Sequence, residues 1–291
     1  MNTYTSLKRF GITSLFAVVL FAAFNSPLHA QGFPTVHCDS QGGSNLQIKI
    51  DAGGDGDKIF LTGVCDDGPY FIFGKHIELI GFASTGATLS SLGSGDVLIV
   101  RGATVVLRNL TIDADGSGTG ILIEGSSADI NSVVVQDASG AGMTIDGSSY
   151  AIVGDSEFNN NDVGIVVIGS SNAFIHQSTI QGNSSRGVVV VGASSASISN
   201  STLINNLVGV LVTKMSTLGL GGNLIENNTE TGVQVADQYG FLEAAVNTIQ
   251  GNGTDVVCEA RGIFESGVAQ ISNTQTTALS GCTLLGLGTV F

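Results

Sequence analysis

The chain has 291 residues and a formal net charge of -14, with 24 acidic residues against 10 Lys and Arg. A surface this acidic repels nucleic acids, anionic lipids and polyanionic sugars unless metal ions screen it. The sequence has 41 Gly, 3 Pro and no Trp, and its charged fraction of 12% is low. We therefore expect turns built on small residues and no nucleic-acid partner.

Residues 1–30 have the three-part pattern of a secretory signal peptide. Lys8 and Arg9 precede an apolar run over residues 12–24, and a short polar stretch ends at Ala30. The apolar run is too short to span a bilayer, so we expect cleavage before Gln31 and no membrane span in the mature chain. A retained membrane anchor is the alternative. Cleavage removes two cations and no acids, which takes the net charge from -14 to -16. The expected location is the periplasm, the cell surface or the extracellular space.

Residues 31–94 are predicted to form an N-terminal cap and irregular first coils. The segment from Ser44 to Ala52 is ambiguous, because Leu46, Ile48 and Ile50 alternate as in a strand although the exposed end of a stacked sheet needs a cap.

Two acidic loops hold candidate calcium ligands. Carboxylates gather in flexible, glycine-containing backbone, and hard cations prefer such oxygen ligands. The alternative is that these residues only make turns, because neither loop has the spacing of an EF-hand. The candidates are Asp51, Asp55 and Asp57 in the first loop and Asp113 and Asp115 in the second.

Residues 95–254 are predicted to form a regular solenoid. A glycine returns every 22 or 23 residues and opens a run in which alternate positions are aliphatic, as in strands with one buried face. Two shorter aliphatic columns recur with the same period, so each coil has three short strands and no room for a helix. The glycines are Gly120, Gly142, Gly164, Gly187, Gly209 and Gly232; the buried residue three places after each is Ile123, Ile145, Val167, Val190, Val212 and Val235.

Polar columns accompany the aliphatic ones. Stacked amides at one bend hydrogen-bond from coil to coil, so we interpret both columns as structural ladders. One column consists of Asn161, Asn183, Asn206, Asn228 and Asn252; the other consists of Ser156, Ser178, Ser201, Asn223 and Asn247.

The four cysteines lie near the two ends of the mature chain. In an exported protein we expect disulfides, and the pairs Cys38–Cys65 and Cys258–Cys282 are favoured because a solenoid keeps its ends apart. A zinc site is the alternative, although no typical zinc-ligand spacing supports it.

The outward positions of the first strand in each coil contain the best catalytic candidates. Arg101, Glu124 and Asp146 are predicted to form one outward column on three successive coils. The alternative is a solvated charge pair retained for solubility. In later coils the outward residues form an apolar stripe, which either the C-terminal tail covers or a second molecule contacts through self-association. The stripe consists of Val166, Ile168, Val189, Val191 and Leu211.

The repeats resemble the right-handed parallel β-helix proteins of the pectin-lyase-like superfamily, in particular the exported bacterial type. The resemblance covers residues 97–254 and extends to the irregular segments at 57–65 and 75–81. It implies an all-β, single-stranded right-handed parallel β-helix with capped ends, and residues 255–291 as a C-terminal cap or tail. In similar proteins a short helix often closes the N-terminal end. In enzymes of this fold, polysaccharide binds in a groove over the column that corresponds to Arg101, Glu124 and Asp146, with carboxylates acting as acid, base or calcium ligands.

The resemblance supports the fold more strongly than any activity, because the superfamily contains lyases, hydrolases, epimerases, adhesins and many members of no known role. We expect a secreted protein that interacts with polysaccharide or another envelope component without a strong catalytic signature. The alternative is a carbohydrate-active enzyme, a polysaccharide lyase or glycoside hydrolase. An ice-binding role is set aside, because the outward columns offer Thr144 and Thr213 without a regular threonine array.

Overall fold

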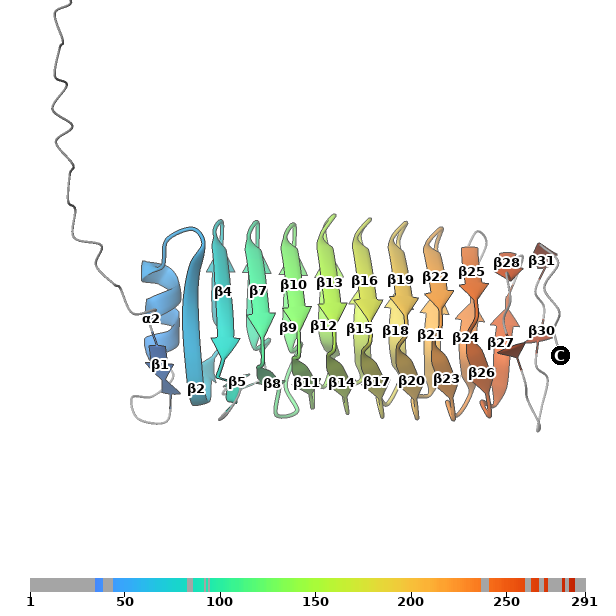
Figure 1. The fold of residues 1–291 in the computed structure, drawn as a ribbon, viewed down its shortest axis with the longest axis horizontal. Helices are drawn as coiled ribbons and strands as arrows, with labels where there is room; N and C mark the ends of the chain where they lie inside the picture. The colour runs from blue at the N-terminus through green and yellow to red at the C-terminus, as the bar shows by residue number, and fades with distance from the viewer. Residues whose placement is uncertain are drawn as a thin grey trace, which may run out of the picture. The chain divides into compact units, whose positions relative to one another are not determined.

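The computed structural model describes residues 35–38, 44–82, 86–91, 93, 95–236, 241–259, 263–266, 270–271, 279–280 and 283–285. Over these residues the chain winds into coils that stack side by side (Figure 1), and every strand pairing is parallel. The predicted fold class, an all-β parallel β-helix with three short strands per coil, is confirmed. The predicted signal peptide at 1–30, Gln31 and Cys282 lie outside the described residues.

The strands form three faces, which we call sheets A, B and C. Sheet A contains β1 (Thr35–His37), β2 (Asp57–Gly68), β4 (His76–Gly81), β7 (Thr104–Arg108), β10 (Ser127–Asn131), β13 (Tyr150–Gly154), β16 (Asn172–His176), β19 (Ser195–Ser199), β22 (Thr217–Gly221), β25 (Phe241–Ala245), β28 (Ile263–Ser266) and β31 (Thr283–Leu285). Sheet B contains the second part of β2, β5 (Ala87–Ser91), β8 (Thr111–Asp113), β11 (Val134–Gln136), β14 (Glu157–Asn159), β17 (Thr179–Gln181), β20 (Thr202–Ile204), β23 (Leu224–Glu226), β26 (Thr248–Gln250) and β29 (Gln270–Ile271). Sheet C contains β3 (Tyr70–Phe73), β6 (Leu98–Arg101), β9 (Ile121–Glu124), β12 (Ala141–Asp146), β15 (Val163–Val167), β18 (Arg186–Val190), β21 (Val208–Val212), β24 (Thr231–Val235), β27 (Thr254–Cys258) and β30 (Leu279–Ser280).

The core is built from aliphatic columns that run along the helix axis. Ile145 pairs with Ile123 on one side and with Val167 on the other, and the same register continues to Val235. These side chains are fully buried. Because neighbouring strands lie about 4.8 Å apart, each β-branched side chain packs on its equivalent in the next coil. The predicted stacking of one coil on the next is confirmed.

Hydrogen-bonded ladders line the inside of the corners. The asparagine ladder lies between sheets B and C, where each amide donates to the side-chain oxygen of the next asparagine at 2.9–3.2 Å. The predicted serine and asparagine column lies between sheets A and B, where each side-chain oxygen accepts from the backbone N–H one coil earlier. Both predicted ladders are confirmed, and they satisfy backbone groups that the bends would otherwise leave unpaired.

A helix caps the N-terminal end. The ambiguous segment forms α2 (Ser44–Ala52), with Leu46 and Ile50 buried and Ile48 60% exposed. The Gln47 side chain donates to the carbonyl of Phe71 and accepts from its N–H, at the edge of sheet C. An unpaired edge strand is a template for aggregation, and the Gln47 side chain bonds to backbone groups that this edge would otherwise expose. The Cys38–Cys65 disulfide, which was predicted, closes the same end.

At the other end the parallel pairing continues beyond Thr254, through β27 and β28 to β31. Asp255 takes the position in β27 that glycine takes in the preceding coils, as the pairing of Thr231 with Thr254 shows. Its carboxylate accepts the side-chain amide of Asn252 at 2.9 Å and so ends the asparagine ladder. Cys258 is disulfide-bonded, but Cys282 lies outside the described residues, so the Cys258–Cys282 pair stays a prediction.

Candidate functional site

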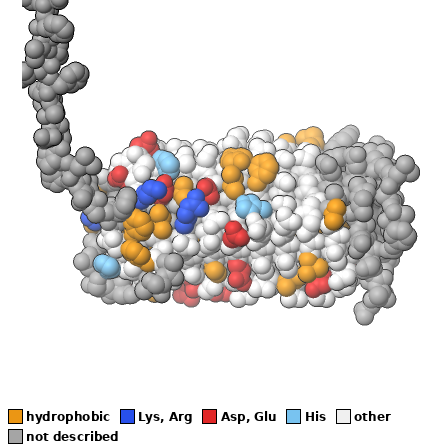
Figure 2. Space-filling view, in the orientation of Figure 1, with side chains coloured by type: hydrophobic (Ala, Val, Ile, Leu, Met, Phe, Trp, Pro, Cys, Tyr) orange, Lys and Arg blue, Asp and Glu red, His pale blue; other side chains and the backbone are white. Residues whose placement is uncertain are grey.

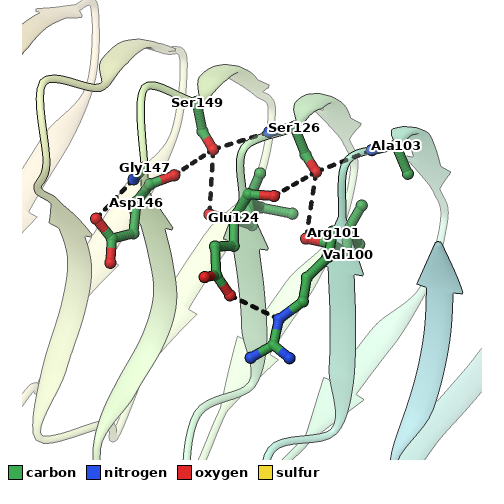
Figure 3. Close-up of polar contacts among 9 residues, drawn as sticks. Val100, Arg101, Ala103, Glu124, Ser126, Asp146, Gly147 and Ser149 are labelled. Carbon is green, nitrogen blue, oxygen red and sulfur yellow. Dashed lines mark hydrogen bonds and ion pairs between the residues drawn. The ribbon is translucent and has the colours of Figure 1, made fainter. Parts of the chain in front are cut away.

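The predicted outward column of charges forms in register on sheet C (Figure 3). Arg101 pairs with Glu124, and Glu124 pairs with Asp146, on adjacent strands. The Arg101 Nε donates to the Glu124 carboxylate at 2.6 Å, and the two side chains are 54% and 46% exposed. The Asp146 carboxylate accepts the N–H of Gly147 at 2.6 Å. The column therefore consists of an exposed ion pair and a carboxylate that is bonded to its own turn.

A third ladder, which sequence reasoning missed, lies inside the corner between sheets C and A (Figure 3). The Ser126 hydroxyl accepts from the N–H of Ala103 and donates to the carbonyl of Glu124. The Ser149 hydroxyl accepts from the N–H of Ser126 and donates to the carbonyl of Asp146. The signal in the sequence is a serine that recurs every 22 or 23 residues; the buried members are Ser126, Ser149, Ser171, Ser194 and Ser216.

An open groove of about 550 Å³ runs along the outside of this same corner. It crosses the turns that enter β4, β7, β10 and β13, so it extends over successive coils. Arg101, Glu124 and Asp146 are not among its lining residues, although the glycines after the first two are. The groove is lined by Asp55, Gly74, Lys75, His76, Gly102, Ala103, Thr104, Gly125, Ser126, Ser127, Ser148 and Tyr150.

The outer rim of the groove carries a row of polar side chains from successive coils. The first residue of each sheet A strand supplies it, and the register pairs His76 with Thr104, Thr104 with Ser127, and Ser127 with Tyr150. Thr104, Ser127 and Tyr150 are exposed. Within the described residues, their hydroxyls and that of Ser148 make no hydrogen bond to the protein. We call Thr104, Ser127, Ser148 and Tyr150 the hydroxyl row.

At its N-terminal end the groove has a lysine and an aspartate that are already bonded, and a histidine nitrogen that is not. The Lys75 ammonium donates to the carbonyls of Ile50, Asp51 and Gly53 at 2.9–3.1 Å, and so caps the C-terminus of α2. The Asp55 carboxylate accepts the backbone N–H of His76 at 2.7 Å. The His76 Nε2 atom is buried and has no partner among the described residues. The groove therefore offers no free lysine or arginine to an anion in this part of the structure.

An aromatic pair lies at the end of the groove, where Tyr150 belongs to the lining and Phe174 stands beside it. The rings of Tyr150 and Phe174, on neighbouring strands β13 and β16, have centroids 5.9 Å apart and an interplanar angle of 53°. Their side chains project from the outer face of sheet A. Figure 2 shows hydrophobic side chains gathered over the part of the molecule where Figure 1 places these strands.

The acidic loops make internal hydrogen bonds. Asp57 accepts the N–H of Gly54, and Asp113 accepts the N–H of Asp115. Asp51, at the end of α2, accepts the side-chain amide of Gln47. Within the described residues, no group of three or more His, Cys, Asp or Glu side chains is arranged to hold a metal ion. The calcium assignment stays a prediction.

The predicted apolar stripe lies on the outer face of sheet C, where Val166, Val189 and Leu211 pair in register. Its side chains are half-buried. Residues 286–291 of the predicted tail lie outside the described residues, so neither covering by the tail nor self-association is tested. Within the described residues, the structure contains no helix with the length and apolar character that crossing a membrane requires.

Comparison with known proteins identifies the fold. The sequence pattern of the family described as right-handed β-helix region matches residues 95–252, more than half of the chain. No curated protein matches the sequence. A pectate lyase structure is similar with a TM-score of 0.59 and 12% identity, covering 84% of this chain and 72% of the lyase.

Two further structures share the architecture. The enzymatically active domain of tailspike protein 2 from bacteriophage CBA120 has a TM-score of 0.58 and 12% identity, covering 84% of this chain and 44% of that domain. A variant of the periplasmic alginate epimerase AlgG has a TM-score of 0.51 and 13% identity, covering 78% of this chain and 77% of the epimerase. At such low identities the likeness establishes the fold alone. The chain belongs to the right-handed β-helix family.

Proposed function

We propose that this protein binds polysaccharide along the groove between sheets C and A. The observation that carries the proposal is the hydroxyl row, which presents, from successive coils along an open groove, O–H groups that have no hydrogen-bond partner among the described residues. A polysaccharide repeats the same hydroxyl pattern along its length. The coil spacing of about 4.8 Å is close to the length of one sugar unit, so equivalent contacts recur from coil to coil.

The fold relatives support the same class of ligand. The pectate lyase and the alginate epimerase are named for chemistry on polysaccharides, and both are β-helix proteins of comparable coverage. Binding on a solenoid surface also suits an extended polymer, because each coil adds an equivalent set of contacts.

We propose further that the protein acts outside the cytoplasm, at the envelope or in the medium, after removal of residues 1–30. The Cys38–Cys65 disulfide supports this location, because disulfides persist in oxidising compartments.

Binding is favoured over catalysis. The Arg101 guanidinium is engaged by Glu124, Asp146 is bonded to its own turn, and the three side chains do not line the groove. The alternative, an enzyme that uses these carboxylates, has its own assay: release of reducing ends or unsaturated products from a glycan panel with calcium present. Activity that is lost in Glu124→Gln and Asp146→Asn would replace the binding proposal with the enzymatic one.

The direct test is a glycan array with the purified mature chain, followed by titration of each retained glycan. We expect Thr104→Val and Ser127→Ala each to weaken binding about fivefold, since a neutral hydrogen bond contributes about 1 kcal/mol. The matched control is Thr179→Val, which removes a hydroxyl from the outer face of sheet B. Failure to retain any glycan, on the array or in an envelope pull-down, would reject the proposal.

A further inference from the structure

The Tyr150–Phe174 pair is an exposed aromatic contact on the outer face of sheet A. Tyr150 is 40% exposed and Phe174 is 48% exposed, and both side chains belong to the outer face of sheet A. The two rings contact each other diagonally across neighbouring strands. Because they project outward, neither ring contributes to the core columns.

Small side chains leave the pair accessible from the following coils. Phe174 pairs with Ser197 in β19, and Ser197 pairs with Gly219 in β22. Tyr150 pairs with Asn172, which pairs with Ser195. Figure 2 shows a hydrophobic patch in this region with mostly uncharged surface beyond it. The two rings therefore protrude from the surface at the end of the hydroxyl row.

The charges near the groove select against an anionic ligand. Lys75 is bonded to three carbonyls, and Arg108, on the adjoining part of sheet A, is paired with Asp129 at 2.9 Å. Asp55 lines the groove, and the whole chain carries a net charge of -14. Among the described residues that line the groove, a polymer of uronic acids would find no free Lys or Arg to bind its carboxylates, whereas a neutral sugar carries no charge for this field to repel.

We infer that Tyr150 and Phe174 form a stacking subsite for a neutral sugar ring, and that the ligand of the groove is an uncharged polysaccharide. This inference rests on the proposed polysaccharide binding and specifies its ligand class. An aromatic ring packs against the C–H face of a sugar, while the hydroxyl row bonds to the sugar's O–H groups on the next units along the groove.

The absence of Trp from the chain provides a specific reporter. Phe174→Trp places a single indole at the subsite and keeps an aromatic side chain there. We expect its fluorescence to change on titration with neutral oligosaccharides and not with uronic-acid oligosaccharides of the same length. The matched control is Phe73→Trp, because Phe73 is 50% exposed and lies on sheet C, a different face from the Tyr150–Phe174 pair. Its emission should not respond.

Calorimetry on the same glycans tests the contribution of each ring. We expect Tyr150→Ala and Phe174→Ala to weaken binding of the neutral chain at least tenfold, and Tyr150→Phe, which keeps the ring and removes one hydroxyl of the row, to weaken it only about fivefold. Unchanged melting curves verify that the variants are folded. Wild-type affinity in both alanine variants would overturn the stacking subsite and leave the proposed function standing, and tighter binding of uronic-acid chains would overturn the neutral ligand class. If no glycan binds the wild-type protein, the proposed function fails and the subsite fails with it.

Discussion

Different side chains stabilise two corners of the coil. Asparagines line the corner between sheets B and C, and serines line the corner between sheets C and A. At the first corner, Asn206 makes hydrogen bonds to the side chains of Asn183 and Asn228 and to the carbonyl of Ile180, in addition to the N–H of Asn183. At the second corner, the buried Ser171 accepts from the N–H of Ser149. The amide ladder joins more groups for each coil, so it contributes more to stability.

The two corners also differ in whether the polar side chains that they expose already have hydrogen-bond partners. Next to the asparagine ladder, the exposed Ser184 hydroxyl is bonded to Asp162. A β-carbon on Gly209 would lie 2.5 Å from the carbonyl oxygen of Gly232 and 3.0 Å from the Asn228 amide, so this corner also requires glycine beside the ladder. At the serine corner, the Ser126 side chain is buried and bonded to backbone groups, whereas the Ser127 side chain is exposed beside the groove. The comparison indicates that one corner maintains the fold while the other is available to a ligand.

We expect the largest loss of stability from a substitution that breaks the asparagine ladder. Asn206→Ala removes the partners of buried groups on both sides of one coil, so we expect the free energy of unfolding to fall by about 3 kcal/mol. Urea denaturation followed by circular dichroism measures the change. The control is Asn205→Asp at the adjacent exposed position, which should stay within about 0.5 kcal/mol of wild type. A loss below about 1 kcal/mol for Asn206→Ala would contradict the structural role of the ladder.

A smaller loss is expected at the serine corner. Ser171→Ala leaves the Ser149 N–H without its acceptor, which costs about 1.5 kcal/mol in the same denaturation experiment. Ser197→Ala, on the outer face of sheet A, is the matched control. A loss as large as that of Asn206→Ala would remove the distinction between the two corners.

Much of this comparison follows from sequence, because the repeat fixes which residues stack. The aliphatic columns, the asparagine ladder and the outward position of Arg101, Glu124 and Asp146 all follow from the period and the alternation of apolar residues. The Cys38–Cys65 pair followed from the separation of the ends of the solenoid. The sequence did not decide between a helix and a strand for α2. Leu46 and Ile50 are four residues apart, so they lie on one side of a helix and also on one side of an alternating strand.

The groove could not be predicted for a geometric reason. Ser126 and Ser127 are adjacent and chemically identical, and only the angle of the corner decides that the first bonds to the backbone and the second faces the groove. The Tyr150–Phe174 contact is also missed by a column analysis, because the two residues occupy different columns of sheet A. The distribution of apolar residues specifies the core, but corner geometry specifies the surface.

A pH-dependent effect is expected where the asparagine ladder ends. Burial raises the pKa of the Asp255 carboxyl above its usual 3.8, although the amide of Asn252 acts in the opposite direction. The folded state therefore disfavours the ionised form, and its penalty is absent below the unfolded pKa and grows as the pH rises through the folded pKa. Asp255→Asn should raise the denaturation midpoint at pH 8 and leave it nearly unchanged at pH 3. The rise at pH 8 should be smaller than the fall that Ser171→Ala causes. A gain that is equal at both pH values would contradict this explanation.

The smallest effect is expected on the outer face of sheet C. Arg101 and Glu124 are about half exposed, so a double-mutant cycle with alanine should give a coupling free energy of about 0.5 kcal/mol that decreases in high salt. Neither substitution should change glycan affinity. A coupling above about 2 kcal/mol would indicate that this pair has a structural or catalytic role beyond a surface ion pair.

Hydrogen–deuterium exchange with and without a bound glycan tests the central claim most directly. The account predicts added protection at the serine corner of the first coils, around residues 102–104, 125–127 and 147–150, and no change over the outer face of sheet C. Protection confined to the strands that carry Arg101, Glu124 and Asp146, with the corner unchanged, would contradict it.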